Sequence, residues 1–273
     1  MIISMKKILF TDMDGTLLNN DSTVTGKMKT ALDDMCAAGH ILVLSSGRPL
    51  NSIIQVKERA GIEYPNTYII ANNGSLVYDC DKKEVIHKTT IPLEVVYRSW
   101  DIAKEMQIHV QTYQNERLIA KEMNEELKVY TSKVHFEIDY CNHPQEIMTE
   151  APCKMLAIDL DNHEDLVGYQ NRLQSEFKGL LQTVFSTPQY LEIFHKDAGK
   201  GSGLKWLCDY LDIPVSCSYA SGDAENDLSM LEVAGFSIAM RNGDEILKNI
   251  ADVVTEKSND EYGLADVIYQ YML

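Results

Sequence analysis

The chain has 273 residues, of which 45% are hydrophobic and 24% are charged, as in a globular protein with a substantial buried core. Its formal net charge of −16 argues against a nucleic-acid partner, because proteins that bind this polyanion present a basic surface. No apolar run approaches the roughly 20 residues that span a bilayer, and residues 1–7 are too short for a signal peptide, so we expect no membrane partner. The six cysteines include no Cys-x-x-Cys pair, which predicts reduced thiols, no zinc site and a cytoplasmic protein.

The first informative segment is residues 8–18, an apolar run that leads into Asp12, Asp14 and Gly15. The run predicts a buried strand, and its carboxyl end is where open α/β sheets keep their sites. In an extended chain, Asp12 and Asp14 project to the same side, and Gly15 then permits a sharp turn. An ordinary Asp-x-Asp-Gly turn explains this segment alone equally well.

A second strand is expected over residues 40–44, after a helix over residues 25–35. A helix between two strands makes a right-handed crossover, so the two strands should be parallel. The second strand ends at Ser46, Gly47 and Arg48, just before the next helix. A hydroxyl group and free backbone N–H groups at this place suit a phosphate, although a capping serine is the alternative.

A third strand over residues 68–71 is followed by a turn at Asn73. From residue 84 to residue 188 helical and strand patterns alternate without a catalytic motif, which predicts a second α/β unit. We therefore expect an α/β fold with a Rossmann-like parallel-sheet core, formed by residues 1–83 and 189–273, and an inserted α/β domain of residues 84–188. Within the insertion, His109, Gln111 and Tyr113 alternate along a strand, and a solvated sheet face explains them better than a face toward substrate.

Two polar segments follow the insertion. Lys200 and Gly201 precede a helix, in a glycine-rich context that lacks the spacing of a nucleotide-binding P-loop. A strand over residues 214–220 then leads to Asp223, and Asn226 and Asp227 follow at the start of a helix. Capping and the helix dipole also favour acidic residues at such a place, so this segment alone does not establish a site.

Taken together, the four polar segments resemble, in order and chemistry, the four motifs of the haloacid dehalogenase superfamily of phosphohydrolases. Four ordered motifs are far more specific than one. The flanking segments 72–74 and 231–242 resemble the Cof-like branch, subfamily IIB, which carries a large α/β cap. The resemblance implies that residues 84–188 form this cap domain.

The resemblance also implies roles for individual residues. The catalytic pair is Asp12, the nucleophile, and Asp14, the general acid and base. The phosphate-binding residues are Ser46, Gly47, Lys200 and Asn226. The ligands of a Mg²⁺ cofactor are Asp12, Asp14 through its backbone carbonyl, Asp223 and, acting through another ligand, Asp227. Arg48 and Asn73 are possible substrate contacts.

The function implied is a Mg²⁺-dependent phosphatase that hydrolyses small phosphate monoesters, such as sugar phosphates or phosphorylated cofactors, through an aspartyl-phosphate intermediate. A phosphotransferase or phosphomutase on the same scaffold is an alternative, and so is a phospho-metabolite-binding module without turnover. The expected partner is a small-molecule phosphate ester, and the sequence leaves monomer and homodimer open.

Overall fold

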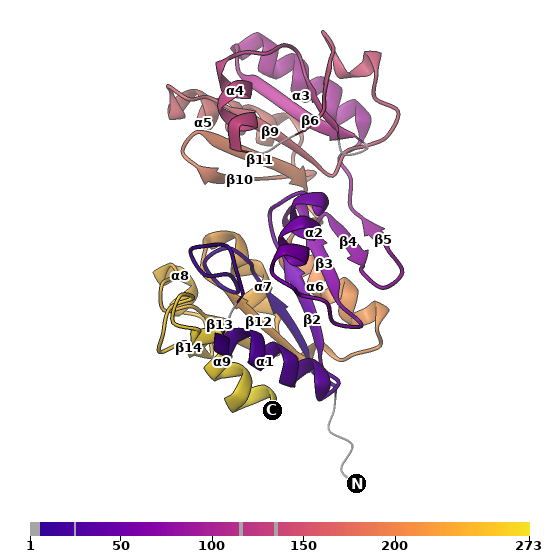
Figure 1. Ribbon diagram of the computed structural model, residues 1–273. Helices are drawn as coiled ribbons and strands as arrows, with labels where there is room; N and C mark the ends of the chain where they lie inside the picture. The colour runs from indigo at the N-terminus through magenta and orange to yellow at the C-terminus, as the bar shows by residue number, and fades with distance from the viewer. Residues whose placement is uncertain (1–5, 25, 115–116, 134–135) are drawn as a thin grey trace. The chain divides into compact units, whose positions relative to one another are not determined.

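The computed structural model describes residues 6–24, 26–114, 117–133 and 136–273. The chain divides into two compact units (Figure 1). The core unit comprises the chain up to Lys88 and the segment Gly199–Leu273, and the inserted unit is the intervening segment Thr89–Ala198. The expectation about a signal peptide falls largely outside the described residues, as does Thr25, the predicted first residue of the first helix.

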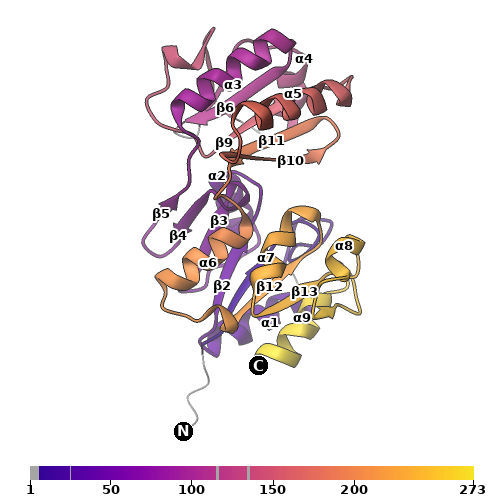
Figure 2. The ribbon, with the colours of Figure 1, turned by 180° about the vertical axis from the view of Figure 1, so that it is seen from behind.

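The core unit is built on a mostly parallel sheet with helices on both faces (Figures 1 and 2). Among the described residues this sheet has eight strands in the order β14-β13-β12-β1-β2-β3-β4-β5, and all neighbouring strands are parallel except in the pairs β3–β4 and β4–β5. The strands are β1 (Ile8–Thr11), β2 (Ile41–Ser45), β3 (Tyr68–Ala71), β4 (Leu76–Asp79), β5 (Glu84–Lys88), β12 (Ser218–Gly222), β13 (Phe236–Ala239) and β14 (Val253–Val254). The helices are α1 (Gly26–Ala37), α2 (Leu50–Arg59), α6 (Lys200–Tyr210), α7 (Leu228–Val233), α8 (Glu245–Lys248) and α9 (Gly263–Val267).

The central strands of this sheet are nearly uninterrupted apolar runs because both faces are covered. Every residue of β1 and β2 is buried. Phe10 and Val43 pack with α6 and α7 in one hydrophobic cluster. On the opposite face lies α1, which buries Met28, Leu32 and Met35 (Figure 1). The predicted α/β class with a Rossmann-like parallel-sheet core is confirmed.

The inserted unit has its own, mostly antiparallel sheet. Among the described residues its strand order is β10-β11-β9-β6-β7-β8. The strands are β6 (His109–Gln114), β7 (Arg117–Ala120), β8 (Ile138–Tyr140), β9 (Lys154–Ile158), β10 (Leu181–Thr187) and β11 (Tyr190–His195). The helices are α3 (Leu93–Met106), α4 (Glu125–Lys133) and α5 (His163–Glu176). A hydrophobic core that includes Trp100 and Tyr169 joins α3 and α5 to one face of the sheet.

The boundaries of the inserted unit differ from the expected residues 84 and 188. β5, which begins at Glu84, pairs with β4 and therefore belongs to the core sheet. β11 pairs with β9 and β10 in the inserted sheet, whereas the sequence predicts a return to the core at residue 189. An alternating strand fits either sheet, and only its pairing partners decide between them. The chain crosses between the units after Lys88 and before Gly199.

The face of the inserted sheet opposite α3 and α5 carries a buried polar network. Gln111 is 0% exposed and donates from Nε2 to the hydroxyl oxygen of Tyr113 at 2.9 Å. The Tyr113 hydroxyl is 2.9 Å from that of Tyr130 on α4. Lys154 and Glu192, both buried, form an ion pair on the same face. The solvated face expected around Gln111 is therefore wrong, because alternation identifies a sheet face but not what covers it.

A close backbone approach in the core unit depends on Gly74. This residue has φ +97°, and an added Cβ would lie 1.9 Å from the carbonyl oxygen of Gly199. The same Cβ would lie 2.7 Å from the backbone nitrogen of Lys200, the first residue of α6. Only glycine combines this backbone conformation with this space, so Gly74 fixes where α6 begins.

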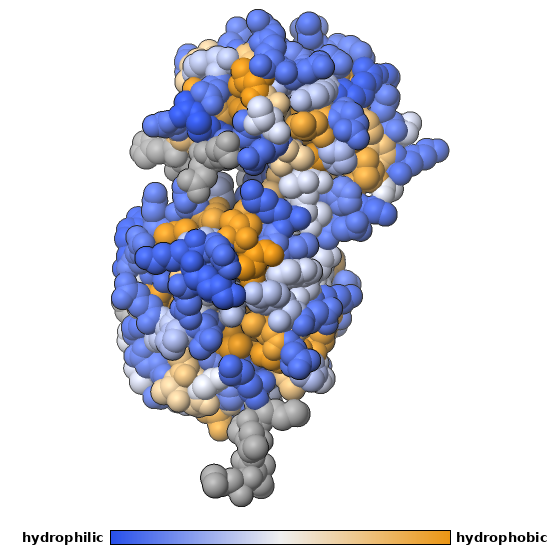
Figure 3. Space-filling model, turned by 90° about the vertical axis from the view of Figure 1, so that its right-hand side faces the viewer, coloured by the Kyte–Doolittle hydropathy of each residue, from blue (hydrophilic) through white to orange (hydrophobic). Residues whose placement is uncertain are grey.

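The hydropathy of the surface is what the amino-acid composition predicts for a globular protein. On the face of the molecule in Figure 3, hydrophilic residues predominate and hydrophobic residues appear in scattered patches. Within the described residues, every helix is too short or too polar to cross a membrane.

Replacing Lys154 should destabilise the inserted unit because it leaves the Glu192 carboxylate buried and unpaired. We expect Lys154→Met to lower the free energy of unfolding by about 3–5 kcal/mol. The double variant Lys154→Met/Glu192→Leu should recover at least half of that loss. Urea unfolding followed by the fluorescence of Trp100, in a Trp206→Phe background, reports on this unit. A double variant as unstable as the single one would contradict the explanation.

Gly74→Ala should destabilise the core unit more than a matched glycine substitution. Gly39 is the control because its φ of +88° is similar but no atom lies within 4 Å of an added Cβ. Gly39→Ala should cost about 1–2 kcal/mol, the strain of a left-handed backbone. Gly74→Ala should cost about 1–3 kcal/mol more, because α6 must also shift. Urea unfolding followed by circular dichroism measures both, and equal losses would show that the close approach is unimportant.

Candidate active site

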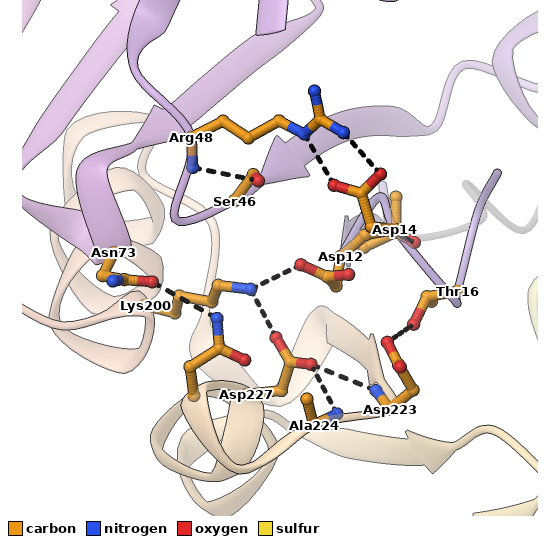
Figure 4. A network of polar contacts seen from close by, with 12 residues as sticks. Asp12, Asp14, Thr16, Ser46, Arg48, Asn73, Lys200, Asp223, Ala224 and Asp227 are labelled. Atoms are coloured by element: carbon orange, nitrogen blue, oxygen red, sulfur yellow. Dashed lines mark hydrogen bonds and ion pairs between the residues drawn. The ribbon is translucent and has the colours of Figure 1, made fainter. Parts of the chain in front are cut away.

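Polar segments far apart in the sequence meet at the carboxyl ends of the parallel strands (Figure 4). Asp12 follows β1, Ser46 follows β2, and Asp223 follows β12. β1 pairs with both β2 and β12 in parallel, so these three strand ends are neighbours. Lys200 joins them from the first turn of α6. The predicted segments therefore assemble where open α/β sheets keep their sites.

The ammonium group of Lys200 lies between two carboxylates. Its Nζ is 2.6 Å from Oδ1 of Asp12 and 2.5 Å from Oδ1 of Asp227. The side chains of Lys200 and Asp227 are 0% exposed and that of Asp12 is 10% exposed. Buried charges are tolerated only when they are paired and hydrogen-bonded, so each of these three groups depends on the others.

The acidic cluster around Lys200 has more negative than positive charge. Asp12, Asp223 and Asp227 offer carboxylate oxygens that lie within 4.8 Å of one another, and Lys200 pairs with two of the three carboxylates. Burial raises the pKa of Asp12 to about 8; the Lys200 ammonium opposes this rise and the Asp227 carboxylate adds to it. Burial also raises the pKa of Asp223 to about 6. The cluster therefore favours the uptake of protons or of a cation.

Hydrogen bonds orient the two acidic residues that follow β12. Oδ2 of Asp227 accepts the backbone N–H groups of Asp223 at 3.0 Å and Ala224 at 3.2 Å. The hydroxyl group of Thr16 donates to Oδ1 of Asp223 at 2.8 Å. An added Cβ at Gly15 would lie 2.4 Å from Oδ2 of Asp223, so a side chain there would displace the carboxylate. The sequence does not indicate that Thr16 belongs to the site, because its partner lies 207 residues away and no spacing predicts the contact.

Backbone hydrogen bonds join the predicted phosphate-binding loop at Ser46 to the end of β3 and the turn after it. The backbone N–H of Ser46 donates to Ile70 at 2.9 Å, and that of Asn73 donates to Ser46 at 3.1 Å. The Asn226 amide donates from Nδ2 to Oδ1 of Asn73 at 3.3 Å. An added Cβ at Gly47 would lie 2.8 Å from the same oxygen. The structure thus brings Ser46, Gly47, Asn73 and Asn226 together.

Asp14 has a different partner from Asp12. The guanidinium group of Arg48 donates from Nε to Oδ2 of Asp14 at 2.6 Å and from Nη2 to Oδ1 at 2.8 Å (Figure 4). The Asp14 side chain is 49% exposed and lies outside the buried acidic group. The sequence left the role of Arg48 open, and this pairing was not predicted.

The site and fold can be compared with those of known proteins. The model of the haloacid dehalogenase-like hydrolase family matches residues 9–268. The chain belongs to this family. The family predicted from the four motifs is confirmed, and so is the enzyme class, a haloacid dehalogenase-type phosphoric monoester hydrolase.

Relatives of this haloacid dehalogenase-like hydrolase include two Bacillus subtilis enzymes. The phosphatase YwpJ is 30% identical over 96% of this chain and 98% of its own. The 5-amino-6-(5-phospho-D-ribitylamino)uracil phosphatase YwtE is 29% identical over 97% of this chain and 98% of its own. The fold matches that of a solved haloacid dehalogenase subclass IIB sugar phosphatase with a TM-score of 0.79 at 21% identity, over 98% of this chain and 100% of the other. That structure shows the same fold, and the family model over residues 9–268 confirms the predicted Cof-like branch.

The acidic cluster suits the divalent metal ion that haloacid dehalogenase-like hydrolases generally use. Its donors are carboxylate oxygens, which hard divalent cations prefer. Burial raises the pKa of Asp12, and a cation beside its carboxylate would favour the charged form and so oppose that rise. The carboxylate donors and the electrostatics of Asp12 therefore both favour a divalent cation at this cluster.

Metal binding should stabilise the protein more as the pH rises. The folded-state pKa values of about 6 and about 8 lie above the ordinary 3.8, so without metal their contribution to stability is present at low pH and falls as the pH rises through them. A metal ion must displace these protons, so its affinity rises over the same interval. Saturation at a hundredfold excess over the dissociation constant is worth about 2.7 kcal/mol.

Thermal unfolding with and without MgCl₂, below pH 6 and above pH 8, measures this gain in melting temperature. Asp223→Asn should remove most of the gain. Asp209→Asn, a change of the same kind at an exposed position, should preserve it. A gain that is independent of pH, or that survives Asp223→Asn, would contradict binding at this cluster.

Proposed function

We propose that this protein is a Mg²⁺-dependent phosphatase that hydrolyses small phosphate monoesters through an aspartyl-phosphate intermediate. The observation that carries the proposal is the state of the Asp12 carboxylate. Oδ1 is held by the Lys200 ammonium, while Oδ2 accepts no hydrogen bond from the described residues. One oxygen is therefore oriented and the other has free lone pairs, as an attacking carboxylate requires.

In the first step, Oδ2 of Asp12 forms a bond to phosphorus as the bond from phosphorus to the leaving oxygen breaks. The Asp14 carboxyl group transfers its proton to that leaving oxygen, which departs as an alcohol. In the second step, the oxygen of a water molecule forms a bond to phosphorus and the bond to Asp12 breaks. Asp14, now a carboxylate, takes the proton from that water, which restores both residues.

The phosphoryl oxygens would be held by groups that are already in place. Ser46 and the backbone at Gly47 lie at the end of β2, just before α2, where free N–H groups suit an anion. The Lys200 ammonium and the Asn226 amide complete a set of oriented donors. Donors that need no rearrangement during the reaction are the most effective way to stabilise developing charge.

The residues that would hold Mg²⁺ are Asp12, Asp223 and the backbone carbonyl of Asp14. Asp227 would act through its hydrogen bonds to the backbone of Asp223 and Ala224, because both of its oxygens already have partners. When bound, Mg²⁺ offsets the negative charge of the phosphoryl group and of the carboxylate that attacks it.

Small phosphorylated metabolites are the substrate class that we propose. A relative that spans nearly the same length is named a 5-amino-6-(5-phospho-D-ribitylamino)uracil phosphatase, and the compound in that name is a small phosphate ester. The acidic net charge of −16 is unfavourable for polyanionic nucleic acids. The six cysteines include no Cys-x-x-Cys pair, which supports a reducing, cytoplasmic setting.

Asp12→Asn should abolish phosphate release because it removes the nucleophile. Across a panel of phosphate esters with MgCl₂, we expect turnover to fall by at least about 10³-fold. Asp21→Asn, the same change at an exposed aspartate, is the control and should retain activity. The melting temperature of Asp12→Asn without metal should not fall, because Lys200 remains paired with Asp227 and one of three clustered carboxylates is removed.

Release that survives Asp12→Asn would contradict the nucleophile. Phosphoryl transfer to an added alcohol in place of free phosphate would favour a phosphotransferase. Tight binding of an ester without any turnover by the folded protein would favour a binding module.

A further inference from the structure

Arg48 forms a two-point contact with the carboxylate of Asp14. One guanidinium group engages both oxygens of the Asp14 carboxylate, at 2.6 and 2.8 Å. No other described residue forms a hydrogen bond or ion pair with that carboxylate. A carboxylate has about four acceptor sites, so the two that Arg48 uses leave one on each oxygen for a proton. Asp14 is thus oriented by a single residue and is still able to exchange a proton.

Arg48 is itself held in place. Its backbone N–H donates to Oγ of Ser46 at 3.2 Å, and its Nη1 donates to Oγ of Ser52 on α2 at 3.3 Å. Its carbonyl oxygen accepts the N–H of Asn72 at 3.0 Å. The guanidinium group is therefore fixed to the same loop that carries the proposed phosphate-binding serine. The position of Asp14 is coupled to that loop even though the two are 34 residues apart.

The stability of the fold does not explain this ion pair. The two side chains are 35% and 49% exposed, and exposed pairs contribute only about 0.2–1 kcal/mol. The pair does orient Asp14, because a planar guanidinium group that binds both oxygens of a carboxylate fixes the position and the plane of that carboxylate. Proton transfer requires such control, since a misplacement of about 1 Å can cost about 10²-fold in rate.

We propose that Arg48 is a positioning residue that aligns the Asp14 carboxyl group with the leaving-group oxygen. This inference rests on the phosphatase function proposed above. A direct contact between Arg48 and the substrate phosphate is the competing role. The two roles differ in how they depend on the leaving group, because an alkoxide needs a proton to depart whereas 4-nitrophenolate does not.

The test compares kcat/KM for an alkyl phosphate and for 4-nitrophenyl phosphate. This parameter covers the reaction only as far as release of the leaving group, so the later hydrolysis of the aspartyl phosphate does not enter. The variants are Arg48→Ala and Arg48→Lys, each with Asp14 and with Asp14→Asn. Lysine keeps the charge but cannot form this two-point contact.

The ratio of kcat/KM for the alkyl ester to that for the aryl ester should fall by about 10²-fold in both Arg48 variants. It should not change further when Arg48→Ala is added to Asp14→Asn. Guanidinium ion in solution should partly restore the alkyl ester reaction of Arg48→Ala. The gain in melting temperature with MgCl₂ should be unchanged, because Arg48 contacts the side-chain carboxylate of Asp14 and not the backbone carbonyl proposed to hold the metal ion.

An equal loss with both esters, or a loss that persists in Asp14→Asn, would overturn the inference in favour of a phosphate contact. Unchanged kinetics in an active enzyme would overturn it as well. Absence of phosphate release by the wild-type protein would instead overturn the proposed function, so the two failures are distinguishable.

Discussion

The Lys200 ammonium is the group on which the rest of the site depends. It joins the end of β1 to the segment after β12, through partners that are 188 and 27 residues away in the sequence. Without it, two buried carboxylates would face each other with no counter-charge. Its placement follows from the backbone at Gly74, which lets α6 start against the end of β3. A glycine in a turn thus determines where a charge lies in the site.

The position of Lys200 also gives the two aspartates of the first motif, Asp12 and Asp14, different surroundings. Asp12 is buried beside Lys200 and two other carboxylates, and burial raises its pKa to about 8. Asp14, two residues later, is half exposed and bound to Arg48. Groups of the same chemical type can take different roles in catalysis when their surroundings differ in this way. The difference lies in their partners, since Asp12 pairs with Lys200 and Asp14 with Arg48.

The sequence predicts the fold and the candidate residues well where local patterns are enough. Asp12, Ser46 and Asp223 each follow an apolar strand, and the rule for parallel sheets brings such strand ends together. Contacts between side chains that are far apart in the sequence cannot be predicted in this way. Thr16 with Asp223, and Arg48 with Asp14, depend on rotamers and loop paths that no spacing encodes.

The boundaries of the inserted unit also depend on contacts between segments that are distant in the sequence. β11 has an alternating pattern that fits either sheet, and its assignment requires the knowledge that β9 is its partner. The burial of Gln111 was missed because alternation does not show that α4 and its Tyr130 cover that face. Strand identity is therefore a local property, while pairing and coverage are properties of the whole unit.

The insertion also has a consequence for the order of folding during synthesis. β1 is the strand between β2 and β12, but β12 is made about 200 residues after β1, once the whole inserted unit has been synthesised. At the usual rates of translation this is a delay of roughly 10 to 40 s. During that time β1 has an open edge, and an apolar open edge is prone to wrong pairing. The nascent chain must therefore rely on early pairing with β2, or on chaperones, until the segment Gly199–Leu273 is synthesised.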